Sequence, residues 1–352
     1  MVKSCQITNQ MIRIKFIHKL PWLIVKQQAI HLLLVTGLLL FAAPSFSQPA
    51  LPMDTDVLVK KLVPPEGRID VVLDTDTYNE IDDQFAVVYA LLSPERINLK
   101  AIYAAPFHNS RSTNAEEGMV KSYDELTRLL AKMNISPHSF VYHGSTSFLT
   151  DANQPVESEA AKNLIDLAMN AEAPLYVLSL GAPTNIASAI LMEPKIINKI
   201  IVVWLGGKGL NWPTASEFNL RQDLYSSKIL FDSGVPLVQI PTEPVSSHLL
   251  TTLPEVEHHL RGYNDIGDYL VDIFKGYRED HFAYAKVIWD IAVVAYIINH
   301  DWVSTNLSST PILTDQVTYS VDNNRQLYKV ATYVNRNKVL EDLFIKIQHY
   351  ED

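Results

Sequence analysis

The strongest constraint on the fold is an alternation of short apolar runs with longer stretches of helical spacing. The apolar runs are rich in β-branched residues and lie at Ile69–Leu73, Leu99–Ala104, Leu175–Leu180, Ile200–Leu205 and Pro236–Ile240. Such runs are typical of strands buried on both faces. Helical spacing spans Asp82–Leu92, Glu116–Leu130, Glu157–Ala171 and Thr184–Leu191. This alternation predicts an α/β fold with an open, mostly parallel, Rossmann-like sheet and helices on both faces.

The later part of the chain departs from this alternation. Residues 251–300 look helical, and Gln316–Tyr333 alternates around Asp322, Asn323 and Asn324, which predicts a hairpin. Ligands of parallel sheets bind outside the carboxyl ends of the strands. In this chain the residues just after the apolar runs are unusually polar and acidic. They are therefore the first candidates for a site.

The N-terminal segment has the layout of a secretory signal peptide. Residues 1–47 contain five basic residues and no acidic one, and Leu32–Ala43 is an apolar run followed by small residues at Ser45 and Ser47. A membrane anchor is the alternative, but a spanning helix needs roughly 20 apolar residues. We expect cleavage near Ser47, export to the periplasm or the medium, and a single domain over residues 48–352.

Charge and cysteine content exclude several kinds of protein. Without residues 1–47 the chain has 24 basic and 39 acidic residues, a formal charge of −15, which argues against a nucleic-acid partner. The single cysteine is Cys5, inside the predicted signal peptide. The exported chain would therefore have no disulfide, no zinc-thiolate site and no cysteine nucleophile.

Five carboxylates follow the first predicted strand within ten residues: Asp74, Asp76, Glu80, Asp82 and Asp83. Like charges repel at a strand end unless a cation or hydrogen-bond donors compensate, and hard oxygen ligands favour Ca²⁺ or Mg²⁺. Helix capping by Asp82 and Asp83 is the plainer alternative, because a helix start offers free N–H groups. Capping leaves Asp74 and Asp76 unexplained, so the segment predicts a metal site.

Two enzyme families begin with an acidic strand end of this kind. The Asp-x-Asp-x-Thr/Val signature of haloacid-dehalogenase-like phosphatases matches Asp74 and Asp76, and Tyr78 less well. A phosphatase would use Mg²⁺ and would need a downstream lysine and a second acidic strand end, which the chain does not convincingly supply. The Asp-x-Asp loop of inosine-uridine-type nucleoside hydrolases is followed by Asp-Asp at a helix start, which Asp82 and Asp83 resemble.

Three later segments resemble the nucleoside hydrolases in the right order. Residues 181–187 are similar to the family's Gly-x-x-Thr-Asn-Ile-Ala turn, and residues 206–223 resemble its Gly-Gly, Asn, Glu-Phe-Asn-x-x-x-Asp block. Trp289-Asp290 is similar to the family's late His-Asp or Trp-Asp pair. Together the resemblance covers most of residues 68–300.

The resemblance implies a calcium site and a reaction. Asp76, Asp83, Asp290 and the main-chain carbonyl of Leu180 would bind Ca²⁺, together with a water and two ribose hydroxyls. The metal would lower the pKa of this water, and Asp76 would be the general base as it attacks the anomeric carbon. The expected function is hydrolysis of the N-glycosidic bond of ribonucleosides to ribose and free base. The resemblance also suggests a homo-oligomer.

Further side chains would contact the substrate: Asp82, Asn109, Asn211, Glu217, Asn219 and Trp289. Amides and carboxylates suit a polyol that offers both donors and acceptors. Asp82 and Glu217 would also stabilise an oxocarbenium-like transition state. Trp289 stands where some members have a histidine, so we expect it to stack on a leaving purine and to favour purine nucleosides. His108 and His281 are other candidate proton donors.

Two departures from the family pattern bear on the pocket. The acidic loop, Thr77–Ile81, is two residues longer than usual, so we expect Asn79 and Glu80 to reach the pocket. The usual glycine-asparagine turn after the second strand is replaced by residues 104–109. A noncatalytic exported receptor for nucleosides or sugars is a third interpretation, which differs from the enzyme in binding the ligand without releasing base.

Overall fold

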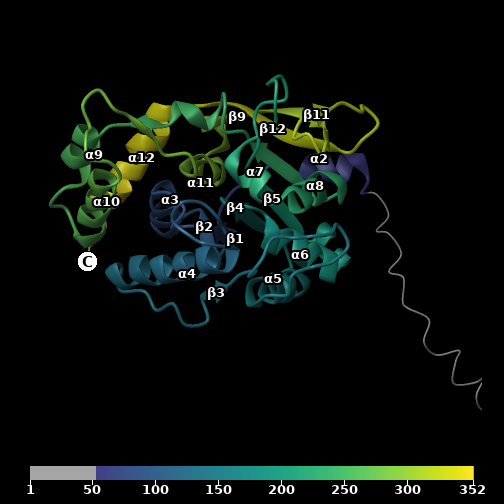
Figure 1. The fold of residues 1–352 in the computed structure, drawn as a ribbon, viewed down its shortest axis with the longest axis horizontal. Coiled ribbons are helices and arrows are strands. Elements are labelled where there is room, and N and C mark those ends of the chain that lie inside the picture. Colours follow the sequence, from purple (N-terminus) through teal and green to yellow (C-terminus); the bar gives the residue numbers. More distant parts are fainter. Residues whose placement is uncertain (1–52, 352) are drawn as a thin grey trace, which may run out of the picture. The chain divides into compact units, whose positions relative to one another are not determined.

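A sheet of eight strands runs through the centre of the molecule in the order β3-β2-β1-β4-β5-β6-β12-β9 (Figure 1). The computed structural model describes residues 53–351, so the predicted signal peptide lies outside the described residues. All neighbouring strands are parallel except β9 and β12. The strands are β1 Ile69–Thr75, β2 Ile97–Ala104, β3 Val141–His143, β4 Leu175–Ser179, β5 Ile200–Leu205, β6 Leu237–Ile240, β9 Val303–Ser309 and β12 Leu327–Val334.

Helices cover both faces of this sheet, because successive strand residues point to opposite sides. Val71 and Leu73 belong to one hydrophobic core, and Val72 belongs to the other. The first core contains side chains of α2 Thr55–Lys61, α3 Asp82–Leu91, α4 Ala115–Lys132, α9 Leu253–Leu260, α10 Asp265–Gly276, α11 Ile291–Ile298 and α12 Arg336–Gln348. The second contains α5 Glu159–Asn170, α6 Thr184–Met192 and α8 Leu224–Asp232. The predicted α/β fold is confirmed.

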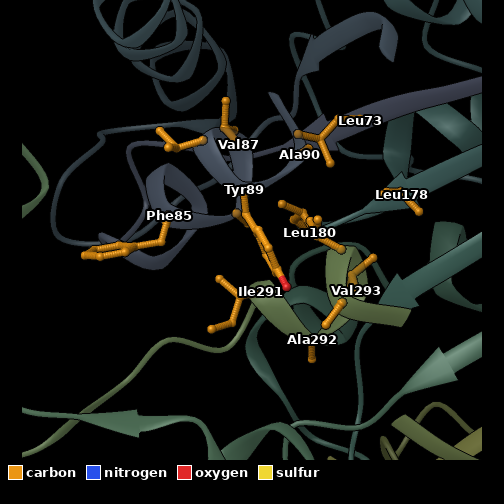
Figure 2. Close-up of a cluster of buried hydrophobic side chains, with 14 of the residues drawn as sticks. Leu73, Phe85, Val87, Tyr89, Ala90, Leu178, Leu180, Ile291, Ala292 and Val293 are labelled. Atoms are coloured by element: carbon orange, nitrogen blue, oxygen red, sulfur yellow. The ribbon is translucent and has the colours of Figure 1, made fainter. Parts of the chain in front are cut away.

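Two helices, α3 and α11, lie at the centre of the first core. Residues 82–90 of α3 and 291–297 of α11 are all buried, as expected for α11, which is apolar on every side, and for the part of α3 that follows its polar first turn. In Figure 2, Phe85 and Tyr89 of α3 and Ile291 of α11 lie in one cluster with strand residues such as Leu178. This packing fixes the N-termini of both helices.

The later part of the chain differs from the sequence-based expectation in two places. The segment expected to be helical over residues 251–300 is interrupted by a loop and by β8, Lys286–Val287, which pairs with β7, Leu250–Thr251. The predicted hairpin is wrong: its first arm, β11, pairs with β10, whereas β12 joins the central sheet. Alternation identifies a strand but not its partner, which long-range packing decides.

The remaining elements are short. They are the helix α7 Phe218–Gln222, the strands β10 Ile312–Leu313 and β11 Tyr319–Ser320, and the 3-10 helices η1 Pro194–Asn198, η2 Ser246–His248 and η3 His300–Trp302. Within residues 53–351 no helix is both long enough and apolar enough to cross a membrane.

Candidate active site

A cavity of about 280 Å³ lies where several parallel strands end and where α3 and α11 begin. It collects residues from distant parts of the chain, because the carboxyl ends of parallel strands meet at one edge of the sheet. Asp76 follows β1, Leu180 follows β4, and Thr242 follows β6. The position agrees with the site expected from the sequence.

Seven carboxylates line this cavity, and four of them belong to residues that are at most 3% exposed: Asp76, Asp82, Asp83 and Asp290. Oxygen atoms of Asp82, Asp83 and Asp290 lie within 4.8 Å of one another. Neither oxygen of Asp76 has a hydrogen-bond partner among the described residues, nor does Oδ1 of Asp290. Buried polar atoms normally have partners, so the site lacks positive charge or donors.

Capping does not account for these carboxylates. The residue preceding α3 is Ile81, and no side chain caps that helix. Asp290 precedes α11, and its side chain makes no capping hydrogen bond. Asp83 instead accepts a hydrogen bond from Thr75 Oγ1 at 2.5 Å. The acidic groups therefore have no local structural role that would explain their concentration.

The electrostatics of the cluster point to a cation. Burial raises the pKa of Asp76, Asp83 and Asp290 well above the usual range, and the negative charges of their neighbours raise it further. Such a cluster must take up protons or a positive ion. Since its donor atoms are carboxylate oxygens and the adjacent Leu180 carbonyl, a hard divalent cation fits.

The Leu180 carbonyl is held by Asn219. Asn219 Nδ2 donates hydrogen bonds to the carbonyl oxygens of Leu180 at 2.5 Å and of Leu205 at 3.1 Å, which ties the ends of β4 and β5 together. These bonds use both amide hydrogens, so Oδ1 is the atom left to meet a ligand. Asn219 thus supports the cavity wall as well as lining it.

Glu217 is also committed to the local structure. It is the N-cap of α7, and its carboxylate accepts hydrogen bonds from the backbone N–H groups of Gly207, Asn219 and Leu220 at 2.9 to 3.1 Å. Burial raises the pKa of Glu217, although these three bonds oppose the change. Glu217 lines the cavity, and these hydrogen bonds hold its carboxylate in place.

The lengthened acidic loop forms another wall. Asn79, Glu80 and Asn109 all line the cavity. Asn109 Nδ2 donates to Asn79 Oδ1 at 2.6 Å, and Asn109 Oδ1 accepts from the backbone N–H of Arg111 at 2.8 Å. Arg111 in turn donates to the carbonyls of Tyr78 and Glu80 at 3.2 and 3.0 Å. Hydrogen bonds from Asn109 and Arg111 therefore hold the acidic loop in place.

Not every residue singled out from the sequence reaches the cavity. Trp289 lines it, and its backbone N–H donates to Asp82 Oδ2 at 3.2 Å. Asn211 is exposed and lines a neighbouring hollow with Trp212. His108 and His281 are not among the lining residues. His281 Nε2 instead lies 3.0 Å from the Lys275 carbonyl, so the structure does not support either histidine as proton donor.

Sequence reasoning missed several polar groups at this site. Lys208 and Glu243 line the cavity with their charged atoms 3.6 Å apart, and Thr242 Oγ1 donates to Glu243 at 2.8 Å. They follow β5 and β6, so their position at strand ends was the available signal. Lys286 forms an ion pair with Glu80 and lies in the short strand β8. It does not follow a strand of the central sheet, so its position in the sequence gave no such signal.

The chain is similar in sequence to known enzymes. The model of the inosine-uridine preferring nucleoside hydrolase family matches residues 71–341. The non-specific ribonucleoside hydrolase RihC of Salmonella schwarzengrund is 25% identical over 250 residues, covering 66% of this chain and 79% of that protein. The pyrimidine-specific ribonucleoside hydrolase RihB of Shigella flexneri is 28% identical over 176 residues, covering 46% of this chain and 56% of that protein.

Solved structures share the fold. A purine-preferring ribonucleoside hydrolase from Gardnerella vaginalis superposes with a TM-score of 0.63 at 22% identity, covering 79% of this chain and 98% of that one. An inosine-guanosine nucleoside hydrolase gives a TM-score of 0.66 at 15% identity, with coverage of 81% and 100%. The family match contains all four buried carboxylates of the cavity.

Proposed function

Because the chain belongs to the inosine-uridine preferring nucleoside hydrolase family, we propose that it hydrolyses the N-glycosidic bond of ribonucleosides with Ca²⁺ as cofactor and Asp76 as general base. The observation that carries this proposal is the buried Asp76 carboxylate. Asp76 lines the cavity, and neither of its carboxylate oxygens has a hydrogen-bond partner among the described residues. A base that also binds a cation needs oxygen lone pairs that no other protein group occupies.

The residues that would hold the ion are Asp76, Asp83, Asp290 and the Leu180 carbonyl. Bound calcium would supply a Lewis acid that orients a water molecule and lowers its pKa. Asp82 differs from the other three carboxylates, because the Trp289 N–H and the Lys286 ammonium already face its two oxygens. Asp82 is therefore suited to accept a hydrogen bond from a ribose hydroxyl.

The protein's own groups then carry the proton and stabilise the developing charge. One Asp76 oxygen takes a proton from the attacking water as the new C–O bond forms at the anomeric carbon and the C–N bond breaks. The electron pair of the broken bond leaves with the base, which solvent protonates. Asp82 and Glu217 lie around the cavity, where negative charge stabilises an oxocarbenium-like ribose.

We also propose a preference for purine nucleosides, based on Trp289. Its ring is the large aromatic surface that the sequence places beside the metal-ligand candidate Asp290, and the residue lines the cavity. Stacking on a leaving purine would assist departure of the base. Rates of base release from inosine and uridine test this idea, and faster cleavage of uridine would contradict it.

The decisive experiment measures base release from a panel of ribonucleosides with calcium present or chelated. We expect calcium-dependent release by the purified protein, and a loss of about 10²-fold or more in kcat for Asp76→Asn, since a positioned base contributes about that much. Asp76→Asn keeps the side-chain shape and serves better than alanine. Nucleoside binding without any release would instead indicate a receptor.

Two properties of the intact protein belong to the same proposal. We propose that the chain is exported after cleavage near Ser47, which the N-terminal sequence of the protein recovered from cells would test. Recovery of an uncleaved chain from the cytoplasm would contradict it.

We propose that the protein is a homo-oligomer, and light scattering during size-exclusion chromatography would give its mass. A monomer mass at working concentration would contradict that.

A further inference from the structure

Lys286 is a cation almost completely enclosed beside the acidic cluster. The residue is 5% exposed. Its ammonium group forms an ion pair with Glu80, lies 3.9 Å from Asp82 Oδ1 and donates to the Val287 carbonyl at 3.0 Å. A buried lysine is rare unless paired, so this arrangement requires its anionic neighbours.

Glu80 is placed by the lengthened acidic loop and not by chance surface contact. Arg111 holds the loop through the Tyr78 and Glu80 carbonyls, and the backbone N–H of Asn79 donates to the Asp76 carbonyl at 2.7 Å. The Glu80 side chain is 38% exposed at the rim, whereas the Lys286 side chain beneath it is 6% exposed. Three charged groups therefore follow one another from the rim to the acidic cluster: Glu80, Lys286 and Asp82.

Charges at these separations interact strongly away from bulk water. Lys286 offsets the negative charge of Asp82 and repels any second cation nearby. Glu80 offsets Lys286 from the other side. Neither residue is among the expected ligands, yet both act on the electrostatic potential where Asp82, Asp83 and Asp290 converge.

We propose that Lys286 and Glu80 form a counter-charge pair that sets the calcium affinity of the site, Lys286 lowering it and Glu80 restoring it. Because Lys286 already balances part of the charge of Asp82, Asp82 attracts a second cation less than Asp83 and Asp290 do, although all three lie close together, and it contacts the substrate instead. This inference rests on the metal site of the proposed function but not on its reaction.

The competing explanation is a purely structural tie between the acidic loop and β8. It makes a different prediction. If the ion pair only holds the loop in place, breaking it from either side loosens the cluster, and both single variants bind calcium more weakly. A counter-charge pair instead gives changes of opposite sign.

The test titrates calcium chloride into the metal-free protein by isothermal calorimetry, without nucleoside. We expect Lys286→Met to bind calcium at least about tenfold more tightly and Glu80→Gln at least about threefold more weakly, because each changes the local charge by one unit. The double variant restores the original net charge and should lie close to the unmodified protein. Lys275→Met is the control, since Lys275 is an exposed lysine paired with Glu257 at 3.8 Å.

Weaker binding in both single variants, or no change in either, overturns the proposal. Should Lys286→Met fail to fold, as judged by circular dichroism, Lys286→Gln takes its place, and unchanged or weaker calcium binding by that variant overturns the proposal. Lys286→Arg keeps the charge and should leave the affinity near its original value. Calcium binding that follows the expected pattern in a protein that releases no base would support this inference while defeating the proposed reaction.

Discussion

At the residue scale, Asp74 differs from Asp76, because Asp74 is not among the residues that line the cavity. It is fully buried on β1, where Oδ1 accepts a hydrogen bond from Asn185 Nδ2 at 2.7 Å and Oδ2 has no partner among the described residues. Burial raises its pKa to about 7, although the Asn185 bond lowers it. The ionisable groups near Asp74 are those of Tyr103 in β2 and of Asp76.

This shift predicts a pH dependence of stability in the metal-free protein. The unfolded chain loses the Asp74 proton near its ordinary pKa of 3.8, whereas the folded protein keeps it until about 7. Protonated Asp74 therefore contributes its full share to the free energy of unfolding below pH about 4, and this contribution is lost as the pH rises through about 7. Melting temperatures between pH 4 and 8 would show the decline, and Asp74→Asn should make it shallower. An equal slope in both proteins would contradict the assignment.

Asn219 gives a second prediction at this scale. Asn219→Ala removes both hydrogen bonds that it donates to the ends of β4 and β5 and leaves two carbonyls without those donors. We expect a loss of about 1–3 kcal/mol in the free energy of unfolding, measured with urea. Asn170→Ala is a suitable control, because Asn170 is an exposed residue near the end of α5. A loss of activity with unchanged stability would instead indicate that Asn219 acts only on the substrate.

At the scale of elements, the short helix α7 depends on its cap. Glu217 accepts hydrogen bonds from two backbone N–H groups at the start of a helix of only five residues, and a third from Gly207 after β5. We expect Glu217→Ala to lower the free energy of unfolding by about 1–2 kcal/mol. Glu217→Gln retains an acceptor oxygen and should lose less. Equal losses in urea denaturation would show that the charge, and not the capping geometry, is what matters.

The helices α3 and α11 show why the acidic cluster can exist at all. Both are buried along almost their whole length, so their N-termini cannot move apart to relieve repulsion among Asp82, Asp83 and Asp290. The helix N-termini supply partial positive charge to nearby carboxylates, but only a fraction of a unit each. Packing of apolar side chains elsewhere in these helices thus holds the carboxylates together.

At the scale of the whole molecule, a bound cation should stabilise the fold. A ligand that binds only the folded state at 100 times its Kd adds about 2.7 kcal/mol. We therefore expect calcium to raise the melting temperature of the chelator-treated protein by several degrees, with magnesium less effective at equal concentration. The Asp83→Asn variant should respond less. An identical melting curve with and without calcium would count against a metal site.

Much of the fold follows from local pattern, and the exceptions have a common cause. The apolar pattern predicts a strand at Ile69–Leu73, where β1 spans Ile69–Thr75, and helical spacing predicts a helix at Thr184–Leu191, where α6 spans Thr184–Met192. Hydrophobic periodicity is a property of a short sequence window, so it predicts these elements without information about the rest of the chain. The pairing of β12 with β6 and β9 is not local, and alternation around residues 322–324 could not reveal it.

The α/β class, the acidic loop after β1 and the family can be read from the amino-acid sequence, because apolar periodicity and motif spacing are properties of neighbouring residues. Which polar atoms face each other depends on the packed fold. It brings Asp290 to Asp82 and Asp83 across about 200 residues, gives both Asn219 amide hydrogens to strand-end carbonyls, leaves Asn211 outside the cavity, and sets Lys286 between Glu80 and Asp82. These outcomes depend on the direction of each side chain after the helices and the sheet have packed, and no local pattern encodes that direction.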